Sequence, residues 1–406
     1  MIKKIFKILY LKINYNRINN KIKRNNKIGV IPIIIDCELT HFFIYVEPIL
    51  EEIKKISNIH IELYYGERNK NTGNKYLYYN KQNAFSIDLY KYIKGNIVFL
   101  SPHIYPKGPS SALKIVLGHG ICSAKFSFHP KEYYENYNIY CVSGNLQEEK
   151  IKRSLKLFNI IEKLEVKNIG YPKSDKLFNS IYINKQNEYI KYNFDSNKKT
   201  ILYAPSWEDG LSLREFGISI ISKIIQNNQF NLIVKLHPCS LVSIKDISYT
   251  GGIDWEKEFL IFKNSKNYIF YKSADINELL HISDIMITDF SSVALEFLLL
   301  DKPVIYLDCP KFENTFKTVY KQFNNLSYSE LLADPLCNAG RHVGLINYNY
   351  NKIIDDIEYL INNPNYKINE RKIYADNLLT NKGTSSKVYA KMIIENYYKF
   401  YNKKNN

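Results

Sequence analysis

Residues 284–297 read Asp284-Ile-Met-Ile-Thr-Asp289-Phe-Ser291-Ser292-Val-Ala-Leu-Glu296-Phe297. This pattern predicts a short buried strand, a tight polar turn and a helix that is apolar almost all round. Free backbone N–H groups and the helix dipole both point at such a turn, which favours an anion there. An ordinary helix N-cap explains the same residues without a ligand. Residues elsewhere in the sequence are needed to distinguish an anion site from an ordinary N-cap.

One residue interrupts the apolar pattern of the expected helix. Glu296 is the only charged residue between Asp289 and Asp301, and it follows Ser292 by four positions. The two side chains therefore share one helix face. A capping-box glutamate would follow the cap by three positions instead. A buried carboxylate needs a partner, and a ligand hydroxyl is one candidate.

Short apolar segments alternate with amphipathic segments, which predicts repeated strand–helix–strand units and parallel sheets. In the first series we expect strands over residues 28–35, 60–65, 96–100, 114–117, 137–142 and 163–169, with helices over 42–57 and 147–158. In the second series we expect strands over residues 200–204, 232–236, 268–270, 285–288 and 303–307, with further segments over 218–226 and 276–281, a helix from 291, and a last helix over about 385–401.

These elements predict an α/β protein with two Rossmann-like, doubly wound domains that face each other across a cleft. A chain of 406 residues is long enough for two separate cores. The expected parts are a basic segment over 1–27, a first domain over 28–185, a second over 200–383 and a helix over 384–406 that crosses back to the first domain. The polar residues 176–199 are expected to form the crossover.

The positive charge is concentrated at the N-terminus. Residues 1–27 hold nine Lys or Arg and no acid, so the remainder carries 16 − 9 = +7 of the net +16. Helical spacing of apolar residues in this segment predicts a basic amphipathic helix on anionic lipid, and a solvated basic tail is the alternative. The apolar residues with this spacing are Ile2, Ile5, Phe6, Leu9 and Ile13.

Other sequence features bear on the compartment and on the partners. Six cysteines without a CxxC pair favour free thiols in a reducing compartment. No apolar run reaches the length of a membrane span, and no signal-peptide core is present. We expect a cytoplasmic protein held peripherally on the inner face of the cell membrane. No nucleic-acid-binding motif is present, so nucleic acid is not an expected partner.

Polar residues directly after strands are the candidates for a ligand site, because ligands of such sheets bind beyond the carboxyl ends of the strands. Gly118-His119-Gly120 follows one strand, and its glycines permit close approach of a substrate. Ser206-Trp207 and Lys235-Leu-His237-Pro238 follow two others. The remaining histidines have no comparable context and are interpreted as structural or surface residues: His41, His60, His103, His129, His281 and His342.

A metal site is the competing interpretation of the same histidines. Cys122 lies near His119, and Cys239 lies near His237. Neither spacing is a paired-ligand motif, so no metal is expected. No P-loop, GxSxG or HExxH motif is present.

Five motifs in order resemble the CDP-glycerol glycerophosphotransferase family, which contains the teichoic-acid polymerases and primases. The resemblance spans roughly residues 95–310. Its motifs are Leu117-Gly-His119-Gly120, Ile169-Gly-Tyr171-Pro-Lys173-Ser-Asp175, Ile201-Leu-Tyr-Ala-Pro205-Ser-Trp207, Val234-Lys235-Leu-His237-Pro238, and the run from Asp275 to Ser292.

The resemblance implies a GT-B architecture with the donor bound mainly by the second domain. It implies transfer of an alditol phosphate, glycerol phosphate or possibly ribitol phosphate, from a CDP-activated donor to a hydroxyl. The acceptor would be a polymer or a lipid-linked molecule of wall or capsule synthesis, and CMP would leave. No cofactor is implied.

The resemblance also assigns roles by position. His119 corresponds to the catalytic base and His237 to a histidine at the donor phosphate, together with Ser291 and Ser292. We expect Lys235 and Asp289 on the same phosphate side. We expect Ser206, Trp207 and Glu296 on the nucleotide, with Glu296 accepting hydrogen bonds from ribose hydroxyls. The acceptor side is expected at Gly118, Gly120 and Lys125.

The chain departs from the family pattern after His119-Gly120. Family members usually continue with Thr-Pro and a lysine, whereas this chain has Ile121-Cys122-Ser123-Ala124-Lys125. Two other functions fit the same overall pattern. One is a GT-B glycosyltransferase with a nucleotide-sugar donor, and the other is a membrane-surface binding protein on a degenerate scaffold.

Overall fold

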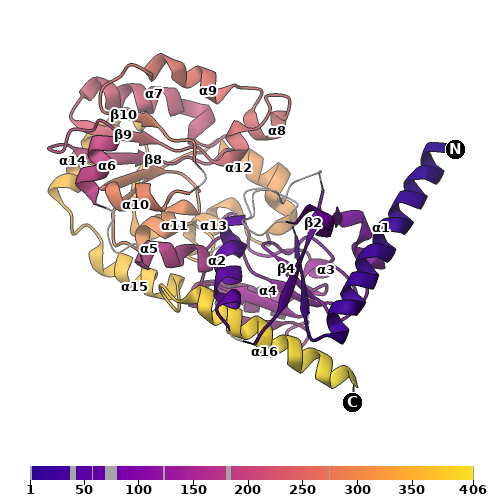
Figure 1. The fold of residues 1–406 in the computed structure, drawn as a ribbon. Coiled ribbons are helices and arrows are strands. Elements are labelled where there is room, and N and C mark those ends of the chain that lie inside the picture. The colour runs from indigo at the N-terminus through magenta and orange to yellow at the C-terminus, as the bar shows by residue number, and fades with distance from the viewer. Residues whose placement is uncertain are drawn as a thin grey trace.

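The structure is a computed structural model, and it describes residues 2–36, 43–56, 58–68, 80–121, 124–179, 184–273 and 275–405. The described chain forms two α/β halves, each around its own sheet (Figure 1). All strand pairings are parallel. The predicted fold class is confirmed.

The sheet of the first half has the order β3-β2-β1-β4-β5-β6-β7 over the described residues. Its strands are β1 Ile31–Asp36, β2 Ile61–Glu67, β3 Ala84–Ser86, β4 Val98–Ser101, β5 Leu113–Val116, β6 Ile139–Val142 and β7 Glu165–Asn168. The main helices of this half are α1 Ile2–Lys27, α2 Phe43–Lys54 and α4 Asn145–Leu157.

The sheet of the second half has the order β10-β9-β8-β11-β12-β13 in the part of the chain described. Its strands are β8 Lys199–Tyr203, β9 Phe230–Val234, β10 Tyr268–Phe270, β11 Ile285–Thr288, β12 Val304–Leu307 and β13 Leu345–Asn347. Its helices include α7 Ser212–Asn227, α10 Asn277–Ile282, α11 Val293–Leu298, α14 Ile353–Asn362 and α15 Ile368–Leu378.

Each sheet is the middle layer of a three-layer sandwich. Successive residues of a strand point to opposite faces. In β1, Ile33 and Ile35 pack with α2, whereas Ile34 packs with α1 and α4. In β8, Ile201 packs with α7 and α14, whereas Leu202 packs with α10, α11 and α15. Burial on both faces explains why these strands are apolar throughout.

The structure differs from the expected elements mainly at short or terminal segments. The strand expected from residue 28 begins at Ile31, because α1 runs to Lys27 and Gly29, with φ of +76°, turns the chain. The three-residue strands β3 and β13 were not expected, and neither were α14 and α15.

The C-terminal helix α16 Ser385–Asn405 returns to the first half, as predicted, and runs along it in Figure 1. Its Ile393 and Tyr397 join the core formed by β1 and α2. The hydroxyl of Tyr389 donates to the carbonyl of Leu117 at 3.0 Å. The last helix of the chain therefore supports the loop that carries His119.

The helix α1 combines a packed part and a projecting part. Ile18 and Ile22 are buried in the first half, and Lys21 Nζ lies 2.7 Å from Glu62 Oε1. The N-terminal end projects away from the body of the molecule (Figure 1). The later residues of α1 are thus part of the first core, although we expected 1–27 to be a separate segment. None of the described helices is long and apolar enough to cross a membrane.

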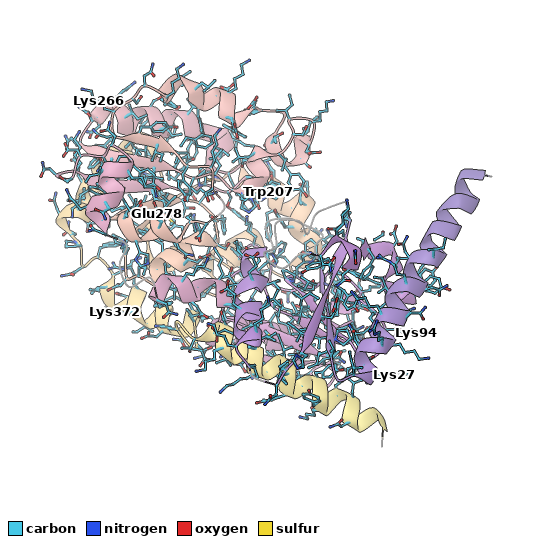
Figure 2. All side chains as sticks on the ribbon, in the orientation of Figure 1. Lys27, Lys94, Trp207, Lys266, Glu278 and Lys372 are labelled. Carbon is cyan, nitrogen blue, oxygen red and sulfur yellow. The ribbon has the colours of Figure 1, made fainter. Side chains whose placement is uncertain are left out.

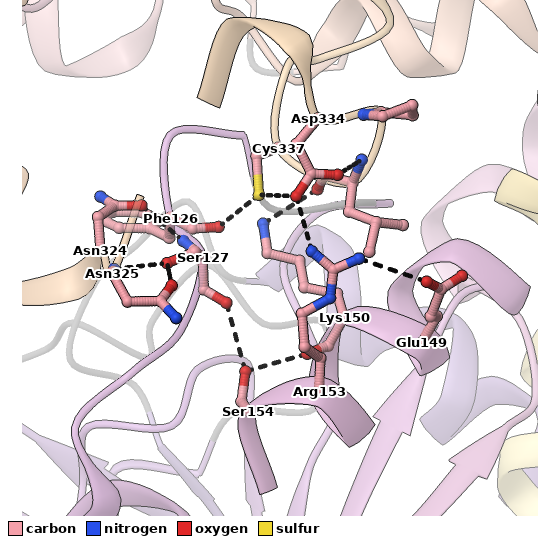
Figure 3. Close-up of polar contacts among 12 residues, drawn as sticks. Phe126, Ser127, Glu149, Lys150, Arg153, Ser154, Asn324, Asn325, Asp334 and Cys337 are labelled. Carbon is pink, nitrogen blue, oxygen red and sulfur yellow. Dashed lines mark hydrogen bonds and ion pairs between the residues drawn. The ribbon is translucent and has the colours of Figure 1, made fainter. Parts of the chain in front are cut away.

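Polar contacts join the two halves beside the cleft between them. Arg153 of α4 forms an ion pair with Asp334 at 2.8 Å, and Lys150 donates to the carbonyl of Leu336 at 3.1 Å. Ser127 donates to Asn325 at 2.8 Å. Figure 3 shows these contacts together with the hydrogen bonds of Ser154 and Cys337. They hold α4 against a loop of the second half.

Among the cysteines, Cys141, Cys239 and Cys309 are free thiols. Cys37, Cys122 and His41, which the sequence interpretation also considered, lie outside the described residues.

Candidate active site

A cavity of about 290 Å³ lies between the two halves and is lined by both. Most of the residues singled out in the sequence meet there. They are Gly118, His119, Gly120 and Lys125 from the first half, and Ser206, Trp207, Lys235, His237, Ser291, Ser292 and Glu296 from the second. Figure 2 labels Trp207 on the side of the second half that faces the first.

His119 lies on the loop that follows β5. Its ring is exposed to the cavity, and Nδ1 lies 3.2 Å from the carbonyl oxygen of Pro102. Because a carbonyl can only accept, Nδ1 carries the hydrogen and Nε2 carries the lone pair. The protein around the ring lowers the pKa of His119 by desolvation, partly opposed by this hydrogen bond. A neutral imidazole with its lone pair on Nε2 is suited to accept a proton.

The glycines beside His119 bring its loop close to the second half. Gly118 has φ of +78°, which L side chains rarely adopt. A Cβ at Gly120 would lie 4.0 Å from Ser292 Oγ. The loop that carries His119 therefore faces the first turn of α11 across the cavity.

His237 follows β9 and has the opposite arrangement of ring hydrogens. Its Nδ1 accepts from the backbone N–H of Cys239 at 3.2 Å, so in the neutral ring the hydrogen lies on Nε2. Its ring centroid is 6.4 Å from that of Trp207. His237 is therefore suited to donate a hydrogen bond, whereas His119 is suited to accept one.

Lys235 lines the same cavity as His237. Its side chain is buried and donates to the carbonyl of Leu236 at 2.7 Å. Burial, and to a smaller extent the positive charge of Lys173, lower the pKa of Lys235 to about 8. An anion bound in the cavity would stabilise the protonated form of Lys235.

The turn before α11 is organised by Asp289, which is fully buried. Its carboxylate accepts from the N–H groups of Ser206 at 3.0 Å, Ser212 at 3.0 Å and Phe290 at 2.6 Å, and from the Ser212 hydroxyl at 2.7 Å. Asp289 therefore lies behind the turn and outside the cavity lining. Its placement does not favour the expected contact with a donor phosphate.

The helix α11 itself is shorter than expected, with only the six residues Val293–Leu298. Its dipole is correspondingly small. Anion binding at this turn would rest on the hydroxyls of Ser291 and Ser292 and on nearby cations.

Glu296 has a protein partner that the sequence did not reveal. Both carboxylate oxygens accept from Lys173 Nζ, at 2.7 and 2.9 Å, and both side chains are buried. Lys173 belongs to the short 3-10 helix η5 Pro172–Ser174 of the first half. Burial alone would lower the pKa of Lys173, but Glu296 and Tyr45 together raise it. This ion pair accounts for the buried charge without a ligand.

Lys125, expected on the acceptor side, is also paired across the cleft. It forms an ion pair with Glu208 of the second half, and Glu208 accepts a further hydrogen bond from Tyr320 at 2.8 Å. The charge of Lys125 is thus already balanced by a carboxylate.

The sequence interpretation missed two histidines of the cavity. His103 and His129 both line it, with Tyr105 between them at ring-centroid distances of 4.9 and 5.7 Å. His103 lies 6.1 Å from the ring of His119, and its Nε2 is 3.9 Å from Asp36 Oδ2. His103 follows strand β4 closely, so the rule that identified His119 would have found it. His129 follows no strand and carried no such signal.

No group of three or more His, Cys, Asp or Glu side chains that could hold a metal ion occurs among the residues described. Of the remaining histidines, His60, His281 and His342 lie away from the cavity lining.

The family model for CDP-glycerol:poly(glycerophosphate) glycerophosphotransferase matches residues 122–336, more than half of the 406 residues. The chain belongs to this family. The match includes the segments that carry Lys173, Lys235, His237 and Glu296.

Named relatives agree with this family. A teichoic acid poly(glycerol phosphate) polymerase of Bacillus spizizenii is 29% identical over 206 residues, 48% of this chain and 47% of the relative. A teichoic acid glycerol-phosphate transferase of Staphylococcus aureus is 25% identical over 220 residues, 50% of this chain and 48% of the relative. The chain spans about half the length of these curated relatives.

Solved structures support the fold. The wall teichoic acid polymerase TagF matches with a TM-score of 0.62 at 16% identity, over 98% of each chain. UDP-GlcNAc 2-epimerase from Neisseria meningitidis matches with a TM-score of 0.50 at 14% identity, over 91% of this chain and 100% of that one. Similarity at these identities concerns the arrangement of the two α/β halves.

Proposed function

We propose that this protein transfers an alditol phosphate from a CDP-activated donor to a hydroxyl group of a wall-polymer acceptor and releases CMP. The observation that carries the proposal is that His119 and His237 line one cavity and that their Nδ1 atoms make hydrogen bonds of opposite direction. His119 offers a lone pair from the first half, and His237 offers an N–H from the second. Transfer of a phosphoryl group needs both functions.

In the proposed reaction, Nε2 of His119 removes the proton of the acceptor hydroxyl as its oxygen attacks the phosphorus next to the alditol. The bond between this phosphorus and the oxygen bridging to the CMP phosphate breaks, and CMP leaves with the electron pair. Nε2–H of His237, the ammonium of Lys235 and the hydroxyls of Ser291 and Ser292 stabilise the negative charge. The proton held by His119 then passes to water.

The nucleotide would lie against the second half. Trp207 is half-buried at the cavity and offers an aromatic face for a base, and Ser206 lies beside it. The oxygens of Glu296 have lone pairs that Lys173 does not use, and these can accept from a ribose hydroxyl. The contact of Glu296 with the ribose stays a prediction. The acceptor would approach over Gly118 and Gly120, where the lack of side chains leaves space.

The choice of donor is supported by the relatives. The matched proteins of Bacillus spizizenii include polymerases of glycerol phosphate and of ribitol phosphate. One solved TagF structure is a variant soaked with CDPG. These names favour a CDP-alditol over the nucleotide sugar of the competing glycosyltransferase interpretation.

A donor screen tests the proposal. The full chain is incubated with CDP-glycerol, CDP-ribitol and a set of UDP-sugars, together with a polymer acceptor, and released nucleotide is measured. We expect CMP from at least one CDP-alditol and incorporation of its alditol phosphate into the acceptor. Consumption of a nucleotide sugar with both CDP-alditols intact would overturn the proposal in favour of a glycosyltransferase. The absence of any turnover would favour a binding protein.

We further propose that α1 holds the protein on the inner face of the cell membrane, near a lipid-linked acceptor. The basic, acid-free sequence and the projecting end of α1 support this. Since Ile18 and Ile22 are part of the core, the test deletes only residues 2–12. We expect the deletion to release the protein from anionic vesicles at low salt and to leave CMP release with a soluble acceptor unchanged. Unchanged vesicle binding would exclude this role for α1.

A further inference from the structure

The ion pair between Lys173 and Glu296 joins the two halves at the floor of the cavity. Glu296 lies one turn after Ser292 on α11, and it lines the same cavity as Lys235 and His237. Its charge therefore lies close to the place where an anionic donor would bind. An unneutralised carboxylate there would repel a phosphate group.

Lys173 is held in place by the first half independently of Glu296. The hydroxyl of Ser174 donates to the carbonyl of Tyr171 at 2.6 Å, and the N–H of Tyr171 donates to Ser385 Oγ at 3.1 Å. Asp175 accepts from the N–H groups of Ser385 and Ser386 at 2.9 and 2.7 Å. The start of α16 thus anchors the segment that presents the ammonium to Glu296.

We propose that Lys173 and Glu296 form an interdomain charge bridge that sets the affinity of the cavity for an anionic donor. Lys173 of the first half neutralises Glu296 of the second. A donor phosphate can therefore bind to the cations and hydroxyls of the cavity without repulsion from the carboxylate of Glu296. The placement of these residues supports this, because Lys173, Glu296 and Lys235 all line the same cavity.

The bridge couples the docking of the two halves to the binding of the donor. When the halves are together, Glu296 is compensated and the cavity accepts a phosphate. When they separate, Glu296 loses its cation and the donor side carries an uncompensated negative charge. Donor affinity therefore depends on the docking of the first half, although Lys173 acts as a positioning residue and needs no contact with the donor. The identity of the donor rests on the proposed function.

Four variants test the bridge: Lys173→Met, Lys173→Arg, Glu296→Gln and the double variant that combines Lys173→Met with Glu296→Gln. Dissociation constants for CDP-glycerol and for uncharged cytidine are measured by calorimetry, and the unfolding temperature of each variant is recorded. We expect Lys173→Met to weaken CDP-glycerol binding by about tenfold to a hundredfold and to change cytidine binding less than about twofold. We expect Lys173→Arg and the double variant to bind CDP-glycerol within about threefold of the wild type.

Glu296→Gln separates this role from a ribose contact. A charge bridge predicts unchanged or tighter CDP-glycerol binding, whereas a required ribose contact predicts weaker binding of both CDP-glycerol and cytidine. Equal binding by wild type and Lys173→Met, or a double variant as weak as Lys173→Met, would overturn the bridge. If Lys173→Met does not fold, Glu296→Gln and the double variant decide alone, and a loss of CDP-glycerol affinity in either overturns it.

Failure of the proposed function gives a different result. A wild-type protein that binds UDP but not CDP-glycerol would contradict the proposed donor. The dissociation constants of the same four variants would then be measured with UDP. Their ratios to the wild-type value would test the bridge in the same way.

Discussion

The proposed donor side and the proposed acceptor side of the cavity are built in different ways. On the donor side, short sequence motifs directly after β8, β9 and β11 bring Ser206, Lys235, His237 and Ser291 to one edge of one sheet. On the acceptor side, His119 is joined by His103 and His129 from separate loops, and by Lys125 paired with Glu208 of the other half. The residues proposed for phosphate recognition thus follow strands that can be found in the sequence, whereas those proposed for the acceptor side meet through distant contacts.

The largest expected effect comes from the base on the acceptor side. We expect His119→Ala to reduce CMP release by about 10²- to 10⁴-fold at saturating donor, because the variant lacks the proposed general base. Its affinity for CDP-glycerol should stay within about threefold of the wild type, since donor contacts lie on the other half. His60→Ala, at an exposed position outside the cavity, is the matched control. An unchanged rate in His119→Ala would contradict the assignment of the base.

The corresponding change on the donor side should affect binding first. We expect His237→Ala to weaken CDP-glycerol binding by about tenfold to a hundredfold, because a hydrogen bond to a charged phosphate is lost. Calorimetry with CDP-glycerol and with cytidine measures this, and cytidine binding should change little. If His237→Ala lowers the rate at saturating donor but leaves donor affinity intact, His237 acts in the chemical step and the proposed role in donor binding is wrong.

A smaller effect is expected from pH. Burial lowers the pKa of Lys235 to about 8, so its ammonium is present below that pH and is lost as the pH rises through it. Donor affinity should therefore fall by up to about tenfold from pH 7.5 to 9.5. Lys235→Arg keeps its charge over this range and should remove the decline. A decline of the same size in Lys235→Arg would assign it to another group.

The rate should respond to pH at the acid end through His119. Desolvation lowers the pKa of His119 below the ordinary value of 6.5, so its imidazole stays neutral to a lower pH than an ordinary histidine does. The acid decline of the rate at saturating donor should therefore have its midpoint below pH 6.5. A rate that already halves near pH 6.5 would indicate a base with an ordinary pKa.

The smallest effect is expected at the interface beside the cavity. Arg153 is half-exposed where it pairs with Asp334, and exposed ion pairs contribute about 0–1 kcal/mol. We expect Arg153→Ala to lower the free energy of unfolding in urea by no more than about 1 kcal/mol and to leave CMP release unchanged. A large loss of activity would show that the orientation of the halves depends on this one contact.

Prediction from sequence succeeded where a feature follows from the local pattern. The strands β8, β9 and β11 are continuous apolar runs, and the residues that line the cavity soon after them are Ser206, Lys235 and Ser291. It failed for Asp289, whose charge suggested a phosphate contact although its carboxylate is used by four donors of its own half. It also failed for His129, which follows no strand.

The sequence by itself determined the two α/β halves, their parallel sheets and the residues at the strand ends, because burial and hydrogen bonding in strands and helices impose periods that can be read along the chain. Only the tertiary structure decided which charges meet. Lys173 and Glu296 are 123 residues apart, and their pairing depends on how two independently wound halves dock. No periodicity encodes such a contact, so the partner of Glu296 became visible only when both halves were in place.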